Sequence, residues 1–451
     1  MLIESLSGVR GYDTDLTVEL ISSYAAALKE LLACRKVVIG RDTRASGVRI
    51  REQLTEALQR YGITVTDLGI CPTPTVEIAV VQHRVDAGVV ITASHNPLPW
   101  NGLKFLGADG LFLNPDQMVW IKQNRQSILA KYSEHHFSPG ALTIYERANR
   151  DHIDTILQLP YIEIEAIRRQ HFKVAVDAVN GAGSLIIPEL LKELGCEVIA
   201  IHCDPNQPFP HPPEPLPENL TDLCRVVKDS AADIGLAIDP DGDRLAIVSD
   251  KGLPISEEYT LVLATKLVLS KTNKKNLKVV ANLSTTRALD DLATQYGAEV
   301  IRTPVGEINV ARRMQIENAL IGGEGNGGVI LPEAHLGRDS LVGTALVLQL
   351  LAEERCSLSA VMPTLPQYLM VKRKAPRGKA DFNEIMNHLI KSVDNAEINT
   401  EDGLKFSWRD SWVHIRTSNT EPIVRIYSEA PTSQTANQLA DRFVALLQKF
   451  I

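Results

Sequence analysis

Residues 87–97 read Ala87-Gly88-Val89-Val90-Ile91-Thr92-Ala93-Ser94-His95-Asn96-Pro97. The apolar half of this stretch is predicted to be a buried strand, which ends abruptly in small and polar residues. Ser94 is therefore expected to present its hydroxyl at the tip of a sheet, where open α/β folds place their chemistry. A serine alone is a poor nucleophile or phosphoryl carrier, so the rest of the chain has to supply a metal, phosphate-binding groups and a base.

The chain repeats one order of elements: an apolar strand, a polar glycine-rich loop, an amphipathic helix and a second strand. The first copy begins at residues 36–40, the second at 172–177 and the third at 277–282. The loop of the first copy leads into apolar residues at helical spacing from Ile50 to Tyr61. Three such units predict three related α/β domains with mixed sheets.

The last stretch of the chain has a different pattern. Strands are predicted at 404–408, 412–416 and 423–427, and a closing helix at 432–450, which together indicate a small α+β domain. The expected domains are residues 1–150, 151–252, 253–370 and 371–451.

Composition narrows the class of protein. The chain has 451 residues, of which 44% are hydrophobic, so several domains with ample cores are expected. A formal net charge of -8 argues against a general nucleic-acid binder. No apolar run approaches the roughly 20 residues that span a bilayer. The six cysteines form no Cys-x-x-Cys pair and no signal peptide is visible, which favours reduced thiols in a cytoplasmic protein.

Asp239, Asp241 and Asp243 lie within five residues, between two apolar runs. Unpaired, these carboxylates would repel each other, whereas a hard divalent cation such as Mg²⁺ or Ca²⁺ accepts oxygen ligands of this kind. An EF-hand is excluded, because it needs glycine where this chain has Arg244 and prefers glutamate where it has Asp250. A polar hairpin with solvated aspartates is the remaining alternative.

Two further loops carry polar side chains. The segment 416–422 combines Arg416 with serine, asparagine and threonine, which predicts an anion cradle to which Arg425 could add charge; an ordinary polar turn is the alternative. The glycine-rich segment 322–328 holds a carboxylate and an amide, Glu324 and Asn326, which suit sugar hydroxyls.

Basic residues near the serine are also candidates. Arg10 lies among glycines, and Lys104 follows Ser94 by ten residues, with an expected turn at Asn101-Gly102 that would bring it back toward the serine. The proline-rich segment 208–217 is expected to be a stiff surface loop.

These elements, in this order, resemble the α-D-phosphohexomutase family, which includes phosphoglucomutase, phosphomannomutase and phosphoglucosamine mutase. The resemblance runs from 8–11 through 416–420, and the motifs Thr-Ala-Ser-His-Asn-Pro and Asp-Pro-Asp-Gly-Asp-Arg are highly specific. It implies an α/β fold of four domains around a central cleft: three related α/β units with mixed sheets and a smaller C-terminal α+β domain.

The resemblance also implies a role for each catalytic and metal-binding residue. Catalysis would use Ser94 as the phosphoryl carrier, Lys104 as general base or acid, Arg10 and Arg244 around the transferring phosphoryl, and His95 as an assisting residue, unless the loop holds it for structural reasons. Mg²⁺ would be held by Asp239, Asp241 and Asp243, with the Ser94 phosphate completing the site.

Substrate binding is implied for a second set of residues. The sugar would be held by Glu324, Asn326 and a second specificity loop with Thr303 and Gly306. The other phosphate, which is not being transferred, would be bound by Arg416, Ser418, Asn419 and Thr420, beside Arg425.

The implied reaction is phosphoryl transfer from phospho-Ser94 to a hexose 1- or 6-phosphate. A hexose 1,6-bisphosphate forms, reorients, and returns its other phosphoryl to the serine. The implied partners are small-molecule hexose phosphates, with no nucleic acid and no membrane, for either a monomer or a homodimer.

The sugar loop departs from the Ser-Gly-His pattern that is usual in bacterial phosphomannomutases and phosphoglucosamine mutases. It resembles an archaeal-type branch labelled phosphoglucosamine mutase, so glucosamine phosphate is the expected substrate, with glucose and mannose phosphates as alternatives. A sugar phosphatase and a non-catalytic phosphosugar-binding protein are the rival functions. The complete distal cradle favours a mutase over the phosphatase, and the presence of Ser94, the three aspartates and Lys104 argues against the non-catalytic protein.

Overall fold

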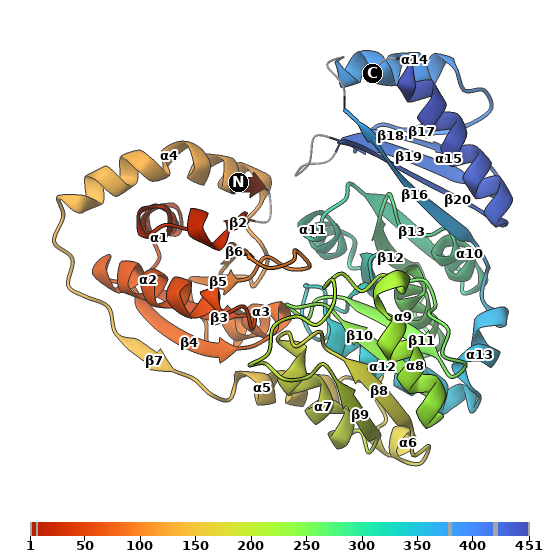
Figure 1. The fold of residues 1–451 in the computed structure, drawn as a ribbon, viewed down its shortest axis with the longest axis horizontal. Helices are drawn as coiled ribbons and strands as arrows, with labels where there is room; N and C mark the ends of the chain where they lie inside the picture. The colour runs from red at the N-terminus through yellow and green to blue at the C-terminus, as the bar shows by residue number, and fades with distance from the viewer. Residues whose placement is uncertain (1, 6–7, 378–380, 418–422, 450–451) are drawn as a thin grey trace.

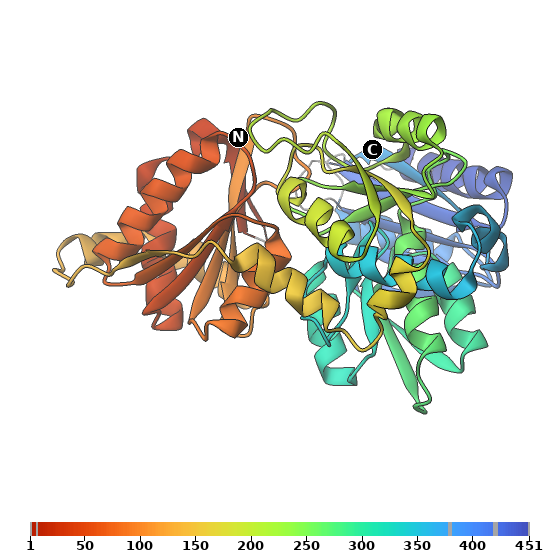
Figure 2. The ribbon, with the colours of Figure 1, turned by 90° about the horizontal axis from the view of Figure 1, so that it is seen from below.

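A computed structural model describes residues 2–5, 8–377, 381–417 and 423–449. Four separate sheets divide the described chain into four units, here numbered first (2–144), second (148–249), third (258–364) and fourth (369–448). Figure 1 shows them following one another along an arc, and Figure 2 shows the first unit beside the other three. Among the helices in the described ranges, none combines the length and apolar character that crossing a membrane requires.

The first unit contains a seven-stranded mixed sheet in the order β1-β2-β6-β5-β3-β4-β7. Strand β5 is buried along its whole length, as its apolar sequence predicts. The strands are β1 (Leu2–Ser5), β2 (Gly8–Tyr12), β3 (Lys36–Arg41), β4 (Thr64–Ile70), β5 (Ala87–Ile91), β6 (Trp100–Gly107) and β7 (Leu142–Ile144). The helices are η1 (Asp13–Asp15), α1 (Val18–Leu32), α2 (Ser46–Arg60), α3 (Thr73–Gln82) and α4 (Pro115–Ser133).

The expected turn at Asn101-Gly102 is wrong, because both residues lie inside β6. A Cβ on Gly102 would come within 2.5 Å of the Val9 carbonyl oxygen, so this glycine permits close approach of β2 rather than a turn. Lys104 nevertheless returns toward the serine, because β6 pairs antiparallel with β5 and places Lys104 opposite Val90.

The second and third units have four-stranded sheets of identical topology, in the orders β11-β10-β8-β9 and β13-β12-β14-β15. In each, three strands are parallel and the last pairs antiparallel. The first unit repeats the pattern in β4-β3-β5-β6, which confirms three related α/β units with mixed sheets.

The second unit consists of α5 (Ala148–Leu157), α6 (Ile164–Arg168), β8 (Lys173–Asp177), α7 (Gly183–Glu193), β9 (Glu197–Ile201), η2 (Pro217–Asn219), α8 (Thr221–Ser230), β10 (Ile234–Ile238) and β11 (Leu245–Ser249). The third consists of α9 (Glu258–Ser270), β12 (Leu277–Asn282), α10 (Ala288–Gln295), β13 (Ala298–Thr303), α11 (Glu307–Glu317), β14 (Ile321–Glu324), β15 (Gly328–Ile330), α12 (Ser340–Glu354), α13 (Leu358–Val361) and η3 (Met362–Thr364). One continuous apolar cluster joins the two units.

The fourth unit is an antiparallel sheet in the order β16-β20-β19-β18-β17 with two helices, which confirms a smaller C-terminal α+β domain. The three predicted strands and the closing helix are present; a further helix and two further strands were not predicted. The elements are β16 (Leu369–Pro376), α14 (Phe382–Lys391), β17 (Glu397–Asn399), β18 (Leu404–Ser407), β19 (Trp412–Thr417), β20 (Ile423–Ala430) and α15 (Ser433–Gln448).

A buried polar chain fastens the first unit to the third. His335 lies between two carboxylates, with Nδ1 3.2 Å from Glu77 Oε2 and Nε2 3.1 Å from Asp339 Oδ2. The same Asp339 oxygen lies 2.8 Å from His152 Nε2. Burial lowers the pKa of His335, but the two carboxylates outweigh it and raise the pKa to about 10.

Candidate active site

Ser94 lies in the loop that follows β5, as predicted, and it is buried. Its backbone has a φ of 51°, a left-handed conformation that is uncommon outside glycine. The buried Arg44 holds this conformation, since its Nη2 donates to the carbonyls of Ser94 (2.6 Å) and Asn96 (2.7 Å). The loop is therefore held by Arg44 from elsewhere in the first unit as well as by its own bonds, such as the one from the Ser94 amide to the Thr92 hydroxyl at 2.9 Å.

The three aspartates occupy the equivalent loop of the second unit, between β10 and β11, and all are fully buried. The Ser94 Oγ lies 3.4 Å from Asp239 Oδ2, so the two loops meet across the boundary between units. Asp239 Oδ1 accepts the backbone amides of Asp243 and Arg244, each at 3.1 Å. These amide bonds fix the turn of the loop.

The carboxylates fit a divalent cation. Asp241 Oδ1 and Asp243 Oδ1 have no hydrogen-bond partner in the described part of the chain, although both are buried acceptors. One oxygen from each aspartate lies within 4.8 Å of the others. An all-oxygen donor set of this kind suits Mg²⁺, whereas uncompensated burial of three carboxylates would be costly.

Asp239 and Asp241 differ in their electrostatics. Burial, with Asp243 and Asp241 close by, raises the pKa of Asp239 well above its ordinary value. Burial also acts to raise the pKa of Asp241, but Lys104 and Thr73 hold that pKa below its ordinary value. Their bonds to Asp241 Oδ2 measure 2.6 and 2.8 Å.

Lys104 points into the centre of the site from β6. Burial lowers its pKa, but Asp241 and Asp243 outweigh that effect and raise it above the ordinary value. A small cavity beside Ser94 is lined by both Lys104 and Arg10. The protonated amine is thus available as an acid next to the serine.

Two predicted arginines lie beside the serine loop. Arg10 Nη1 donates to Asn96 Oδ1 at 2.9 Å, and burial together with nearby Arg244 lowers its pKa. Arg244 Nε has no hydrogen-bond partner in the described ranges, and its nearest carboxylates are more than 3.5 Å away. The guanidinium groups of Arg10 and Arg244 repel each other, and an anion bound between them would offset that repulsion.

His95 Nδ1 lies 3.3 Å from Ser94 Oγ. Burial, with Arg244 and Arg10, lowers the pKa of His95 well below its ordinary value, so the ring is neutral at neutral pH. The proline-rich segment is more than a surface loop, because its Glu214 comes within 3.6 Å of Arg244 and 4.0 Å of His95.

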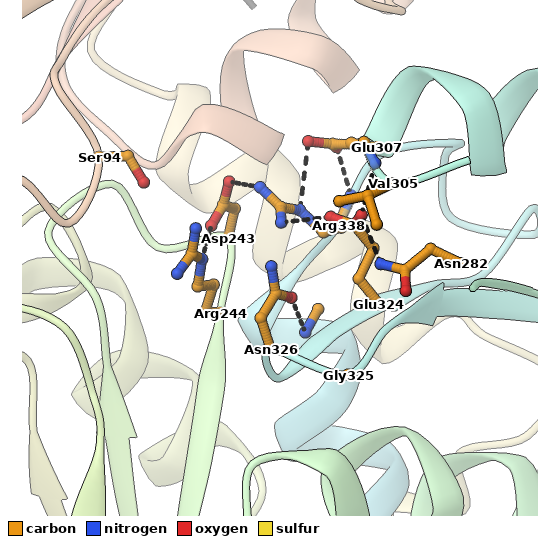
Figure 3. Close-up of polar contacts among 12 residues, drawn as sticks. Ser94, Asp243, Arg244, Asn282, Val305, Glu307, Glu324, Gly325, Asn326 and Arg338 are labelled. Atoms are coloured by element: carbon orange, nitrogen blue, oxygen red, sulfur yellow. Dashed lines mark hydrogen bonds and ion pairs between the residues drawn. The ribbon is translucent and has the colours of Figure 1, made fainter. Parts of the chain in front are cut away.

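The predicted sugar loop connects β14 to β15 in the third unit. Glu324 Oε1 accepts hydrogen bonds from Asn282 Nδ2 (2.8 Å) and from the amide of Gly306 (2.9 Å), as Figure 3 shows in part. Burial acts to raise the pKa of Glu324, but Arg338 outweighs it and the pKa is lowered. The carboxylate is therefore ionised and fixed in orientation.

The other residues predicted to bind the sugar make fewer hydrogen bonds than Glu324. Asn326 Oδ1 accepts the amide of Gly328 at 3.2 Å, and the Thr303 hydroxyl donates to the Pro304 carbonyl at 3.0 Å. Gly306 has a φ of 127°, which lets its amide reach Glu324 from the start of α11.

The predicted phosphate cradle belongs to the fourth unit. Arg416 and Arg425 are directly opposite each other on β19 and β20, and Arg416 Nη1 lies 3.7 Å from Asp402 Oδ2. Cross-strand cations of this kind concentrate positive charge on one face of the sheet. Ser418, Asn419 and Thr420 lie outside the described residues.

Sequence reasoning missed Arg44 and Arg338. Arg44 lies in the polar loop after β3, and Arg338 lies three residues after His335, just before the apolar helix α12. Neither stands in a recognisable motif, and each acquires its contacts only through tertiary structure.

Comparison with known proteins agrees with this fold. Four profiles of one family match the chain: phosphoglucomutase/phosphomannomutase alpha/beta/alpha domains I, II and III at residues 3–131, 150–252 and 256–368, and the C-terminal domain at 370–446. The chain therefore belongs to the phosphoglucomutase/phosphomannomutase family, a family of mutase enzymes.

Two full-length relatives are archaeal. A phosphoglucomutase/phosphomannomutase of Thermococcus kodakarensis is 36% identical, covering 98% of this chain and 97% of the relative. A protein of Methanopyrus kandleri named as a probable phosphoglucosamine mutase is 34% identical, covering 99% and 97%. The crystal structure of a family member from Burkholderia thailandensis superposes with a TM-score of 0.86 at 28% identity, covering 98% of this chain and 96% of that one.

Proposed function

We propose that the protein interconverts hexose 6-phosphates and hexose 1-phosphates through a phosphorylated Ser94 and a hexose 1,6-bisphosphate, with glucosamine phosphate as the preferred substrate. One observation carries the proposal. The Ser94 hydroxyl from the first unit meets the buried aspartates of the second, and Lys104 is bonded to one of those aspartates. The proposed phosphoryl carrier, cation site and proton source would thus lie together.

Asp239, Asp241 and Asp243, with the Ser94 oxygen, would hold Mg²⁺. When bound, the cation would offset the negative charge of the phosphoryl group during its transfer. The partnerless oxygens of Asp241 and Asp243 support this assignment.

In the first half-reaction the sugar hydroxyl forms a new bond to phosphorus and the bond from phosphorus to Ser94 Oγ breaks. The hydroxyl loses one proton and Ser94 Oγ gains one, with Lys104 as the relay between them. Arg10 and Arg244 would hold the oxygens of the transferring group. His95, neutral and 3.3 Å from Ser94 Oγ, would assist by orienting the serine side chain.

The sugar would lie against the third unit. Glu324 and Asn326 would accept and donate hydrogen bonds to its hydroxyls, next to Thr303 and Gly306. The second phosphate would be held by the fourth unit, through Arg416, Ser418, Asn419, Thr420 and Arg425. A distal cradle lets the bisphosphate bind in either orientation, which a mutase requires and a hydrolase does not.

The test is an assay with purified protein, Mg²⁺ and a catalytic amount of hexose 1,6-bisphosphate. Interconversion of 1- and 6-phosphates supports the mutase, whereas stoichiometric release of inorganic phosphate would identify a sugar phosphatase. Binding of hexose phosphate with neither reaction would identify a non-catalytic binding protein.

The substrate preference rests on charge. The ionised Glu324 is suited to the ammonium group of glucosamine, and the sugar loop lacks the Ser-Gly-His of bacterial relatives. A panel of glucosamine, glucose and mannose 1-phosphates, compared by kcat/KM, decides the question. Glucosamine 1-phosphate ranking last would contradict the preference while leaving the mutase chemistry intact.

A further inference from the structure

Arg338 lies at the meeting point of the metal loop and the sugar loop (Figure 3). Its Nη2 lies 2.6 Å from Asp243 Oδ2, and its Nη1 lies 2.7 Å from Glu324 Oε2. Its Nε lies 3.2 Å from Glu307 Oε2. One buried guanidinium therefore contacts a carboxylate of the second unit and two of the third.

The surrounding backbone is shaped to hold this side chain. A Cβ on Gly328 would lie 2.2 Å from Arg338 Cδ, so the sugar loop has glycine where the arginine passes. The Arg338 amide donates to Glu307 Oε1 at 2.8 Å. The next residue, Asp339, caps α12 through the amide of Leu341 at 2.7 Å. Contacts thus hold Arg338 at its backbone amide, along its aliphatic side-chain atoms and at its guanidinium.

The planar, forked guanidinium of arginine suits this position better than the ammonium of lysine. A guanidinium presents donors in several directions within one plane, whereas the ammonium of lysine is a point charge. Only a forked group can reach Asp243 and Glu324 with separate nitrogens. Without it, two buried carboxylates would both lose a directly bonded cation, which is strongly unfavourable.

We propose that Arg338 is a positioning residue that fixes the Glu324 carboxylate relative to the metal loop, and so sets where the sugar ring lies with respect to Ser94. The inference rests on the proposed function, because it assigns Glu324 to the sugar. Arg338 itself does not need to touch the substrate: Glu324 Oε1 is already held by Asn282 and Gly306, and Arg338 supplies the third restraint, on Oε2.

The test compares the full-length protein with Arg338→Met and Arg338→Lys. Binding of glucosamine 1-phosphate is measured by calorimetry in a Ser94→Ala background, which prevents turnover, and Mn²⁺ binding is measured by electron paramagnetic resonance with Ser94 intact. Arg51→Met is the control, since it removes an arginine paired with Asp67 in the first unit. Gly328→Ala displaces the Arg338 side chain without removing its charge.

We expect Arg338→Met to weaken sugar-phosphate binding on the order of 100-fold, the scale seen when a buried charge loses its partner. Arg338→Lys should recover part of this loss, and Gly328→Ala should weaken binding in the same direction. Mn²⁺ binding should persist, because all three aspartates remain, and Arg51→Met should change neither quantity.

Unchanged sugar-phosphate affinity in Arg338→Met would overturn the proposal, as would a parallel loss of Mn²⁺ binding and melting temperature, which would indicate a structural role only. Failure of the proposed function is a separate result. In that case the unaltered protein would not interconvert hexose 1- and 6-phosphates. The effect of Arg338 is measured independently, as the ratio of sugar-phosphate affinities between the variants and the protein with Arg338 intact.

Discussion

The Ser94 hydroxyl oxygen lies 3.4 Å from Oδ2 of Asp239, although the two residues are 145 positions apart in the chain. Each comes from a buried strand end of a different unit, so the distance depends on how the first and second units dock. The site is therefore a property of the docked units and not of either loop alone. Four predictions follow from this arrangement and its surroundings.

Replacing Ser94 with alanine removes the proposed phosphoryl carrier. We expect mutase turnover to fall by at least about a thousandfold, as for loss of a covalent nucleophile. The matched control is Ser22→Ala, another buried serine of the first unit. Retention of bisphosphate-primed turnover by Ser94→Ala would contradict the assignment.

Removing divalent cations should abolish turnover and lower the melting temperature, because the buried Oδ1 atoms of Asp241 and Asp243, which have no hydrogen-bond partner in the described residues, then lose the charge that would face them. Dialysis against a chelator, followed by calorimetry with and without added Mg²⁺, measures both effects. Asp241→Asn should weaken the response to Mg²⁺, while Asp229→Asn, in α8 of the same unit, should not. Full activity in chelator would refute the cation site.

Replacing Glu324 with glutamine keeps its shape and removes its charge. We expect kcat/KM to fall by roughly 10- to 100-fold, because hydrogen bonds from Asn282, Gly306 and Arg338 all favour the ionised form. Steady-state kinetics on glucosamine 1-phosphate provide the measurement. Glu299→Gln, on β13 of the same unit, serves as the control, and equal kinetics for the two variants would argue against a role in sugar binding.

The His335 contact predicts a pH-dependent stability. Its folded pKa of about 10 lies above the ordinary value, so its contribution is complete below about pH 6.5 and is lost as pH rises toward 10. Glu77, Asp339 and His152 surround the ring. The stability advantage of the unaltered protein over His335→Gln should shrink with pH, on the order of 1 kcal/mol per pH unit.

Denaturant titrations at pH 6.5, 8 and 9.5 measure this difference directly. His83→Gln, in which the replaced histidine directly follows α3, controls for general effects of losing an imidazole. A difference that stays constant over this range would show that His335 is not charged in the folded protein.

The sequence predicted those parts of the fold that depend on local patterns. The strand predicted at 277–282 has the observed bounds, because a mainly apolar run, interrupted by Lys278 alone, ends at Asn282. The turn at Asn101-Gly102 failed because close packing against β2 overrides the local preference of the pair.

The same distinction applies to the site. Ser94 and the three aspartates could be found because each stands in a contiguous motif behind an apolar strand. Arg44 and Arg338 could not, because their contacts lie 50 and 95 residues away along the chain. Which carboxylate an arginine meets depends on how the units pack, and no local pattern contains that information.

The serine loop, the metal loop and the sugar loop all occupy one position of the repeated unit, where its third parallel strand is followed by the antiparallel fourth strand. Under the proposed function, the same hairpin position of the three units would serve three different tasks: carrying the phosphoryl group, holding the cation and recognising the sugar. Exchanging one of these loops between family members should therefore alter the task of that loop alone, because the strands that position the other two loops are unchanged.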